Sequence, residues 1–334
     1  MTQRIHKEEL AHLFESIQQL HVVVVGDVML DNYWWGEVDR ISPEAPVPIV
    51  ALQKRESRLG GAANVALNCK SLGAKVTLAS VVGDDKDGAL LKQLTEDAGI
   101  RTDLIMLSKH RTTTTKTRVI SRNQQMMRLD DEVSEELYTE EEHPFIDKVL
   151  RFLQIEKPDV LIFEDYNKGV LKENVIHRIT EHCKELGLVT AVDPKRKNFL
   201  SYKDVTIFKP NLKEVREGLN VAVEEVNVET LSEVNEKLKN ILNHQVTFIT
   251  LSEKGVYFNN QNSAAIIPSH IRNIADVSGA GDTVIATAAL VYTLTKDAHL
   301  MAEISNLAGG LVCEQVGVVP IDKALLQQEA QQIL

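Results

Sequence analysis

The segment DVSGAGDT, residues 276–283, stands between a polar stretch and an apolar one that continues to residue 295. Its small residues allow a backbone to approach a ligand closely, because glycine and alanine carry little or no side chain. If the apolar stretch is helical, its first amides point the positive end of a dipole at the same place. The segment therefore predicts an anion-binding turn that opens a helix. We expect a buried helix over 283–295, since crossing a bilayer takes about 20 residues.

Asp282 lies at the mouth of this predicted turn. A carboxylate there can accept the proton of an attacking hydroxyl while the amides of Gly279, Ala280 and Gly281 stabilise charge on a transferred phosphoryl group. The alternative is a glycine-rich turn that Asp282 simply caps. Short glycine motifs recur by chance, so the segment alone weights the two interpretations about equally.

Outward from this segment, short β-branched runs alternate with stretches of helical apolar spacing. The predicted strands are residues 22–25, 75–82, 159–163, 188–193, 204–208 and 246–251. The predicted helices are residues 86–98, 139–155, 170–187, 224–242, 283–295 and 298–316. This alternation is typical of an α/β fold with a mostly parallel central sheet and helices on both faces. No linker-like stretch divides the 334 residues, so we expect one domain over 1–334.

Two stretches interrupt the alternation, residues 31–50 and 111–130. Prolines in the first and β-branched alternation in the second predict strands and turns instead of helices. They could pair into a small second sheet, or they could be two irregular loops packed on the body, and their spacing favours neither. A small sheet would act as a lid or a dimer surface, because its strand edges and the aromatics of segment 33–35 need covering.

Further clusters of polar or small residues occur between the predicted elements. Asn64, after a Gly-Gly-Ala-Ala turn, could bind a sugar hydroxyl, although the turn could also be a tightly packed helix start. Asn211 and Glu214 could hold the hydration shell of Mg²⁺ beside a polyphosphate, but in isolation they are more typical of a capping box. Segments 164–168 and 193–195 end predicted strands. Because such ends meet at one edge of a parallel sheet, the clusters together indicate a ligand site there.

Composition and missing motifs argue against several other functions. Lys+Arg 37 against Asp+Glu 48 leave a net charge of −11, which disfavours binding to nucleic acid or to an anionic membrane. Three widely separated cysteines and the lack of an apolar leader predict a protein of the reducing cytoplasm. The sequence contains no P-loop, no dinucleotide-binding glycine fingerprint, no nucleophile elbow and no histidine spacing typical of a zinc enzyme.

Taken together, these residues resemble the ribokinase-like (PfkB) family of carbohydrate kinases. The two family signatures correspond to GGAANVALN at 60–68 and DVSGAGDTVIA at 276–286, and the likeness covers nearly the whole chain. Val277 stands where many members have threonine, which leaves the GAGD core intact. Within the family, the bacterial heptose 7-phosphate kinases are most similar over three segments, 26–36, 40–50 and 115–130. Some of those proteins carry a nucleotidyltransferase domain, which we do not expect here because the sequence has no HxGH motif.

The resemblance implies a ribokinase-like kinase that uses ATP and Mg²⁺ to phosphorylate the anomeric hydroxyl of D-glycero-D-manno-heptose 7-phosphate, on the route to lipopolysaccharide. It implies that Asp282 is the catalytic base, with Gly279, Ala280 and Gly281 as the anion hole. The implied nucleotide and magnesium contacts are Asn211, Lys195, Ser252 and Glu214, the last reaching Mg²⁺ through water. The implied sugar contacts are Asp31, Gly60, Gly61 and Asn64, with Asp165 and Lys168 in addition. It also suggests a monovalent cation, K⁺, near Asp276.

One further expectation comes from charge. A substrate with a distal phosphate needs cations at the far end of the sugar, and segment 111–130 supplies Lys116, Arg118, Arg122 and Arg128 on an acidic protein. We hypothesise that this segment, with Lys116 and Arg118 foremost, binds that phosphate. The alternative is that these are solvated edge-strand charges that oppose aggregation.

We expect a homodimer formed through the small sheet. Two other functions stay open from the sequence: a PfkB-type kinase of another sugar or sugar phosphate, such as ribose or a fructose phosphate, and a non-catalytic sugar or nucleotide sensor on the same fold. The intact Asp282 and the Asn211–Glu214 pair argue against the sensor, because a protein that only binds needs no base.

Overall fold

The computed structural model describes residues 6–122, 124–270 and 272–333, which form a large and a small β-sheet. The strands of the large sheet are β1 His21–Gly26, β4 Lys75–Gly83, β5 Arg101–Ser108, β8 Val160–Glu164, β9 Val189–Asp193, β10 Ile207–Phe208, β11 Val246–Thr250, β12 Val256–Asn259 and β13 Ala264–Ile267. Their spatial order is β13-β12-β11-β10-β9-β8-β1-β4-β5. All neighbours from β11 to β5 are parallel, and β12 and β13 add an antiparallel edge. This confirms the predicted, mostly parallel sheet.

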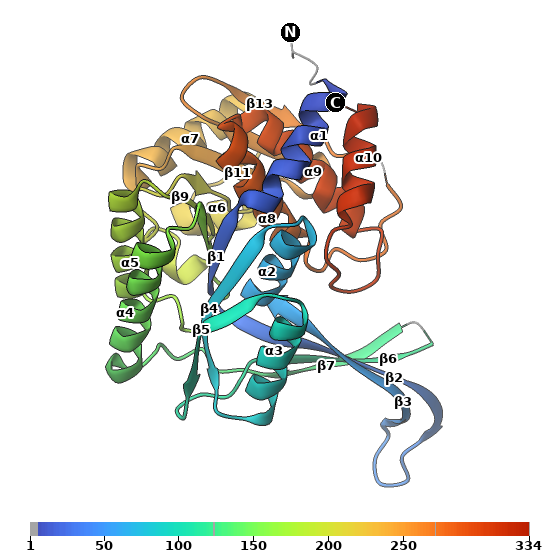
Figure 1. Cartoon of the computed structure of the whole chain (residues 1–334). Coiled ribbons are helices and arrows are strands. Elements are labelled where there is room, and N and C mark those ends of the chain that lie inside the picture. Colours follow the sequence, from blue (N-terminus) through green and yellow to red (C-terminus); the bar gives the residue numbers. More distant parts are fainter. Residues whose placement is uncertain (1–5, 123, 271, 334) are drawn as a thin grey trace.

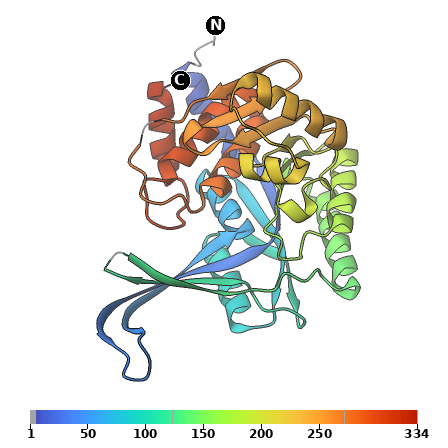
Figure 2. The ribbon, with the colours of Figure 1, turned by 180° about the vertical axis from the view of Figure 1, so that it is seen from behind.

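Helices cover both faces of the large sheet (Figures 1 and 2). One face carries α1 Lys7–Ser16, α2 Ala62–Ser71, α3 Lys86–Asp97, α8 Ala280–Thr295, α9 Ala298–Val312 and α10 Lys323–Ile333. The opposite face carries α4 Thr139–Glu156, α5 Glu173–Leu186, α6 Leu212–Leu219 and α7 Val228–Leu242. Side chains alternate between the two layers, so that on β8 Ile162 faces the α8 layer and Phe163 faces the α5 layer. Helix α8 is buried over most of its length, as its composition predicts.

The small sheet consists of β2 Val28–Ile41, β3 Pro48–Gly61, β6 Thr115–Ser121 and β7 Gln124–Asp131 in the order β3-β2-β6-β7. It takes in both interrupting stretches, but most of β3 lies beyond the first stretch, which was expected to end at residue 50. Of the two alternatives, a second sheet or loose loops, the structure has the sheet. It projects from the body in both views (Figures 1 and 2). Strand β2 starts one residue after β1 ends, and β3 runs directly into α2 at Gly61. The small sheet is therefore joined to the body at the carboxyl ends of the central strands.

Several expected boundaries differ from the structure. Strands β5, β12 and β13 were not predicted, and the strand expected over 204–208 is only Ile207–Phe208. It is shortened because Asp204 has a positive φ of 61° and the Thr206 amide donates to the Thr190 hydroxyl at 2.9 Å rather than to a ladder carbonyl. The helix expected over 298–316 ends at Val312. In the described part of the chain, we find no helix that combines the length and hydrophobicity a membrane span requires.

Candidate functional site

Asp282 occupies the first turn of α8 and is 4% exposed. Its Oδ2 accepts a hydrogen bond from Asn64 Nδ2 at 2.7 Å, and its Oδ1 accepts one from the Tyr166 hydroxyl at 2.9 Å. Burial raises the pKa of Asp282 to about 6, helped by the charge of Asp193 and opposed by the bond from Asn64. The carboxylate is thus held in one orientation by residues of α2 and of the loop after β8, and its pKa lies close to physiological pH.

The turn that precedes α8 has the conformation its glycines predict. Gly279 caps the helix with a φ of 80°, and a Cβ there would lie 3.0 Å from Asn64 Nδ2. Gly281 faces the other way, since a Cβ there would point toward Asp193 Oδ2 at 3.6 Å. The amides of Ala280, Gly281 and Asp282 belong to the first turn, where N–H groups have no partner within the helix, although the Ala280 amide donates to the Val277 carbonyl before it at 3.3 Å. Donors and the dipole end therefore converge beside the Asp282 carboxylate.

A row of charged side chains crosses the carboxyl ends of three neighbouring strands. Glu164 pairs in register with Asp193, and Lys209 follows β10 next to them. Lys209 Nζ lies 2.7 Å from Asp193 Oδ2. Burial acts to raise the pKa of Asp193, but Lys195 and Lys209 outweigh it and the pKa is lowered. Asp193 is therefore an anion with two cationic partners.

Glu164 is completely buried, and neither of its carboxylate oxygens has a hydrogen-bond partner among the described residues. Burial, followed by the charges of Asp193 and Asp282, raises its pKa well above the ordinary value. Glu164, Lys209 and Tyr166 were not assigned a role from the sequence. For all three the available signal was their place at the ends of predicted strands, and Glu164 and Tyr166 both lie in segment 164–168, which that signal had marked.

Asn211 and Glu214 form the capping box that is the ordinary structural interpretation of their spacing. Asn211 Oδ1 accepts from the Glu214 amide at 2.9 Å, and Glu214 Oε2 accepts from the Asn211 amide at 2.8 Å. The remaining oxygen, Glu214 Oε1, binds Lys195 Nζ at 2.6 Å. Ser252, predicted beside them, is exposed in the loop after β11, whose Thr250 bridges to Asn211. The four residues that the sequence linked to nucleotide and metal are thus neighbours at one edge of the sheet.

The predicted sugar residues come from two places. Asp31, Gly60, Gly61 and Asn64 lie in the small sheet or in α2, which follows it, and Asp165 and Lys168 follow β8. Asp31 lies on β2 and pairs with Arg118 on β6 at 2.6 Å, and a Cβ on Gly60 would collide with the Asp31 carboxylate. Gly61 has a φ of 59°, and a Cβ there would lie 2.5 Å from the Asp27 carbonyl oxygen. The small sheet therefore brings Asp31, Gly60, Gly61 and Arg118 to the same end of the body as Asn64.

Asp165, another predicted sugar contact, lies at the end of β8. It follows Glu164 and points to the opposite face, where its carboxylate accepts from Asn198 Nδ2 at 3.0 Å and from the Tyr202 hydroxyl at 2.8 Å. Tyr202 belongs to the core beneath α5, away from α8. Burial raises the pKa of Asp165 to about 6. Both of these side-chain hydrogen bonds go to Oδ2, and Oδ1 accepts from the Asn167 amide at 2.8 Å, so the Asp165 carboxylate is bound by groups other than the predicted sugar contacts.

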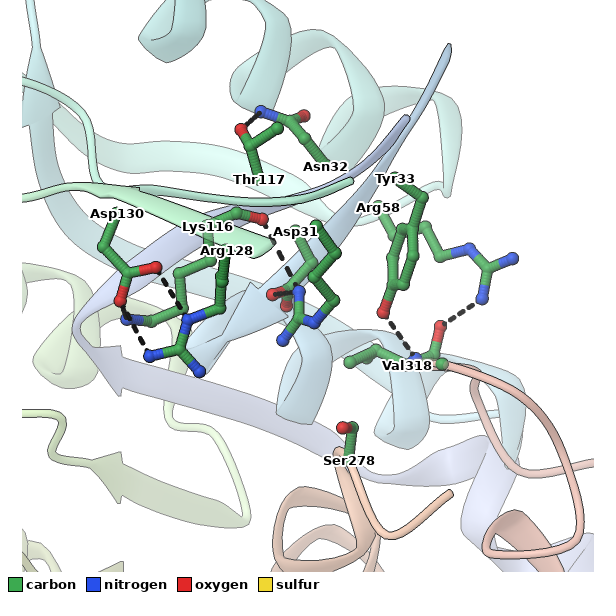
Figure 3. A network of polar contacts seen from close by, with 12 residues as sticks. Asp31, Asn32, Tyr33, Arg58, Lys116, Thr117, Arg128, Asp130, Ser278 and Val318 are labelled. Carbon is green, nitrogen blue, oxygen red and sulfur yellow. Dashed lines mark hydrogen bonds and ion pairs between the residues drawn. The ribbon is translucent and has the colours of Figure 1, made fainter. Parts of the chain in front are cut away.

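Three of the predicted phosphate-binding cations, Lys116, Arg118 and Arg128, have carboxylate partners (Figure 3), and the fourth, Arg122, is exposed in the turn after β6. Lys116 Nζ lies 3.1 Å from Asp130 and 3.0 Å from Glu132, and Lys168 Nζ lies 2.7 Å from Glu132. Arg128 also binds Asp130, at 2.8 Å. Two lysines from different elements therefore converge on the Glu132 carboxylate, which shows that this place accommodates an anion.

Both carboxylate oxygens of Asp276 accept hydrogen bonds from backbone amides. Oδ1 accepts from the Ser278 amide and Oδ2 from the Gly317 amide, both at 2.9 Å. Burial acts to raise the pKa of Asp276, but these amides and Arg118 outweigh it and the pKa is lowered. No group of three or more His, Cys, Asp or Glu side chains placed to hold a metal ion occurs among residues 6–122, 124–270 and 272–333.

Comparisons with known proteins show the family to which the chain belongs. Residues 19–324 match the family described as pfkB family carbohydrate kinase. The chain belongs to the pfkB family. A D-beta-D-heptose 7-phosphate kinase of Bordetella bronchiseptica is 38% identical over 323 residues, which are 95% of this chain and 98% of that protein. The bifunctional protein HldE of Campylobacter curvus is 39% identical over 300 residues, which are 90% of this chain and 63% of HldE. The chain thus spans less than two thirds of the HldE relative.

Solved structures of pfkB-type kinases share the fold. Phosphofructokinase-2 from Escherichia coli, in complex with substrates and products, superposes with a TM-score of 0.78 at 16% identity over 94% of this chain and 99% of that chain. Ribokinase from Arabidopsis thaliana, complexed with ribose and ATP, gives a TM-score of 0.70 at 16% identity over 94% and 99%. At this identity the likeness establishes the ribokinase-like fold alone.

Proposed function

We propose that this protein transfers the γ-phosphoryl group of ATP to the anomeric hydroxyl of D-glycero-D-manno-heptose 7-phosphate and so forms the 1,7-bisphosphate. The observation that carries the proposal is the buried Asp282 carboxylate, held by Asn64 and Tyr166 beside the first amides of α8. The similarity to the Bordetella bronchiseptica heptose 7-phosphate kinase over nearly its whole length supports this substrate. The product would serve ADP-heptose and lipopolysaccharide core synthesis.

In this reaction Asp282 accepts the proton of the anomeric hydroxyl as its oxygen attacks the γ-phosphorus. The new bond joins the sugar oxygen to phosphorus, the bond from phosphorus to the β-γ bridging oxygen breaks, and ADP leaves with that oxygen. A pKa of about 6 leaves Asp282 mostly ionised at pH 7 yet basic enough to take the proton. The amides of Gly279, Ala280 and Gly281 stabilise charge on the transferred group, because they require no reorganisation.

Lys195, Asn211, Glu214 and Ser252 are proposed as the nucleotide side of the site. Lys195 is the cation of this group, and its partners Asp193 and Glu214 hold it near the end of β9. The donors fit Mg²⁺ chemically, because they are carboxylate and amide oxygens, but Glu214 already uses both oxygens. Glu214 would therefore hold Mg²⁺ through water. Bound there, Mg²⁺ would neutralise charge on the β- and γ-phosphates.

A monovalent cation is proposed near Asp276, whose carboxylate oxygens each keep a lone pair besides the one that accepts an amide hydrogen. The amide hydrogens come from Ser278 and Gly317. A potassium complex is known for Escherichia coli phosphofructokinase-2, and that observation concerns that protein. We derive no step of the reaction from K⁺.

Asp31, Gly60, Gly61 and Asn64 are proposed to bind the sugar, and the small sheet is proposed to be its lid. The 7-phosphate would bind between Arg118, Lys116 and Lys168. These cations and Arg128 carry four positive charges against the three carboxylates that they bind, Asp31, Asp130 and Glu132. The cluster so defined has one excess positive charge on a protein of net charge −11. A phosphate would displace Glu132 or Asp130 and gain charge-assisted hydrogen bonds.

The small sheet is also the proposed dimer surface. Strand β7 is exposed along its whole length, and it presents Met126, Met127 and Leu129 at 42%, 53% and 49% exposure. A second copy would cover this apolar edge strand. Light scattering on the purified protein tests the proposal, and a monomer at all concentrations would contradict it.

The three cysteines are all free, which supports the cytoplasm as the compartment.

The deciding experiment measures ADP release against a panel of sugars and sugar phosphates. We expect the highest kcat/KM with heptose 7-phosphate. A higher value with ribose or a fructose phosphate would make the protein a pfkB-type kinase of another sugar. Binding of sugar and nucleotide without turnover of any compound would make it a sensor. In either case the proposed reaction is wrong.

A further inference from the structure

The segment between α9 and α10 is held by the lid. Val318 donates its amide hydrogen to the Tyr33 hydroxyl oxygen at 3.0 Å. Arg58 Nη1 donates to the Val316 carbonyl at 3.3 Å and to the Val318 carbonyl at 3.1 Å. Tyr33 lies on β2 and Arg58 on β3, so two strands of the small sheet hydrogen-bond to residues 316–318 (Figure 3). These hydrogen bonds are separate from the chain connections through Asp27 and Gly61 that join the lid to the body.

The same segment holds the turn that forms the proposed anion hole. The Gly317 amide donates to Asp276 Oδ2, and Asp276 Oδ1 accepts from the Ser278 amide, both at 2.9 Å. Ser278 directly precedes Gly279, the cap of α8. Figure 3 shows Ser278 beside the Val318 segment. A continuous path of hydrogen bonds therefore runs from the lid through residues 316–318 to the start of α8.

Residues 316–318 pack closely against Tyr33 and Arg58. Gly317 has a φ of 75°, and a Cβ there would lie 2.9 Å from Tyr33 Oη and 3.0 Å from Arg58 Nη1. The Arg58 guanidinium stacks on the Tyr33 ring at 4.8 Å. The Arg118 guanidinium also contacts this ring, at 5.2 Å, and binds Asp31. Tyr33 is thus packed between the cation proposed to bind the distal phosphate and the segment that holds the anion-hole turn.

We propose that Tyr33 and Arg58 are positioning residues that latch the lid to the anion-hole turn. Through residues 316–318 and Asp276, the position of the lid sets the position of segment 276–281 and of the amides before Asp282, so a sugar that holds the lid in this position also holds the turn. The proposal rests on the proposed function in one respect, that sugar binds under the lid and the nucleotide at α8. It predicts a coupling between the two ligands, because each stabilises the same arrangement of the turn.

The first test uses the protein without ligands and measures amide hydrogen exchange in wild type, Tyr33→Phe and Arg58→Gln. Tyr33→Phe removes one hydroxyl and keeps the ring, and Arg58→Gln removes the charge and both carbonyl contacts. We expect the Gly317 and Ser278 amides to exchange roughly three- to tenfold faster, the range for loss of a typical hydrogen bond. Arg55→Gln is the matched control, because Arg55 lies on the same strand and contacts Trp34 instead. Faster exchange at Gly317 with no change at Ser278 would overturn the latch.

The second test measures the Kd of a non-hydrolysable ATP analogue with and without saturating heptose 7-phosphate. We expect wild type and Arg55→Gln to show tighter nucleotide binding when the sugar is present, by a factor of roughly 5 or more. In Tyr33→Phe and Arg58→Gln this factor should fall toward one, while the Kd of each ligand alone changes less than threefold. A role in general stability would shift the unfolding midpoint without removing the coupling.

The outcomes separate the latch from the proposed reaction. If wild type turns over heptose 7-phosphate and both variants keep the wild-type coupling factor, the latch is wrong and the reaction stands. If wild type turns over no sugar phosphate, the reaction is wrong, and the exchange of Ser278 in the ligand-free protein still decides whether the lid holds the turn.

Discussion

Removing the Tyr166 hydroxyl should shift the pH dependence of catalysis to higher pH. The Tyr166 hydroxyl donates to Asp282 Oδ1 at 2.9 Å, and this bond lowers the pKa of Asp282 against the stronger effect of burial. Tyr166→Phe keeps the ring that faces Lys195 at 5.4 Å. The substitution therefore removes one stabilising bond from the ionised carboxylate and changes little else.

The magnitude follows from the strength of the lost bond. Hydrogen bonds to charged groups contribute about 1.5–3 kcal/mol, and 1.36 kcal/mol corresponds to one pKa unit. Taking the low end, because water can enter the space of the lost oxygen, the pKa of Asp282 should rise from about 6 to roughly 7. A raised pKa keeps the base protonated to higher pH, so activity is lost on the acidic side. The ionised fraction at pH 6 falls about fivefold, whereas at pH 8 it falls only about 10%.

The assay is kcat/KM for heptose 7-phosphate between pH 5 and 9, because this parameter reports the ionisation of the free enzyme. Tyr257→Phe is the control, since the Tyr257 hydroxyl binds Ser232 and Asn259 away from the site. We expect the acidic limb to move by about one unit in Tyr166→Phe and to stay in place in Tyr257→Phe. An acidic limb that does not move in Tyr166→Phe, or that moves to lower pH, would refute the assignment of Asp282 as the titrating base.

Three further predictions concern single residues. Asp282→Asn should lower kcat by about 10²-fold or more while nucleotide affinity changes little. The same substitution should stabilise the fold above pH 6 by up to about 3 kcal/mol. The reason is that a folded-state pKa of about 6 makes the ionised carboxylate destabilising at high pH, whereas below the pKa of the unfolded state the carboxyl group has no effect on stability. Calorimetry at pH 8 and pH 4 measures this, and equal effects at both would contradict it. Asp165→Ala should lower the free energy of unfolding, measured in urea, by about 2–4 kcal/mol, since Tyr202 and Asn198 each lose an acceptor. We expect its kcat to stay within threefold of wild type. A large loss of kcat in folded protein would instead place Asp165 in the site. Arg118→Ala should raise the KM for heptose 7-phosphate at least tenfold and leave the KM for unphosphorylated heptose nearly unchanged, and equal losses on both would remove Arg118 from the phosphate site.

Residues close together in the chain were predicted well because their geometry is local. The turn at Gly279 needs a positive φ and no side chain, and both requirements are visible as glycines. The capping box of Asn211 and Glu214 is likewise a matter of one helical turn. That Asn64 and Asp282 meet was not predicted, because the two residues are 218 positions apart in the chain and no local pattern links them.

The sequence could not decide which face of the sheet a side chain enters where one residue more or less along a strand settles it. Glu164 and Asp165 are adjacent carboxylates at the end of β8, yet Glu164 faces α8 and Asp165 faces the core beneath α5. Successive side chains of a strand point to opposite faces, so a motif known only to within a residue does not tell which carboxylate enters the site. Lys209 was missed for a related reason: its role depends on the register that sets it beside Asp193.

By itself, the sequence determined the parallel α/β body, the small sheet as a possibility, and a buried aspartate beside the first amides of a helix, because hydrophobic period, glycine conformation and helix polarity are properties of a short stretch of chain. Only the tertiary structure decided that Tyr166 and Asn64 share the Asp282 carboxylate, that the cations of the lid already bind Asp31, Asp130 and Glu132, and that Tyr33 and Arg58 hold residues 316–318. These contacts join segments far apart in the chain, and the packing of whole elements, not any local pattern, sets their distances.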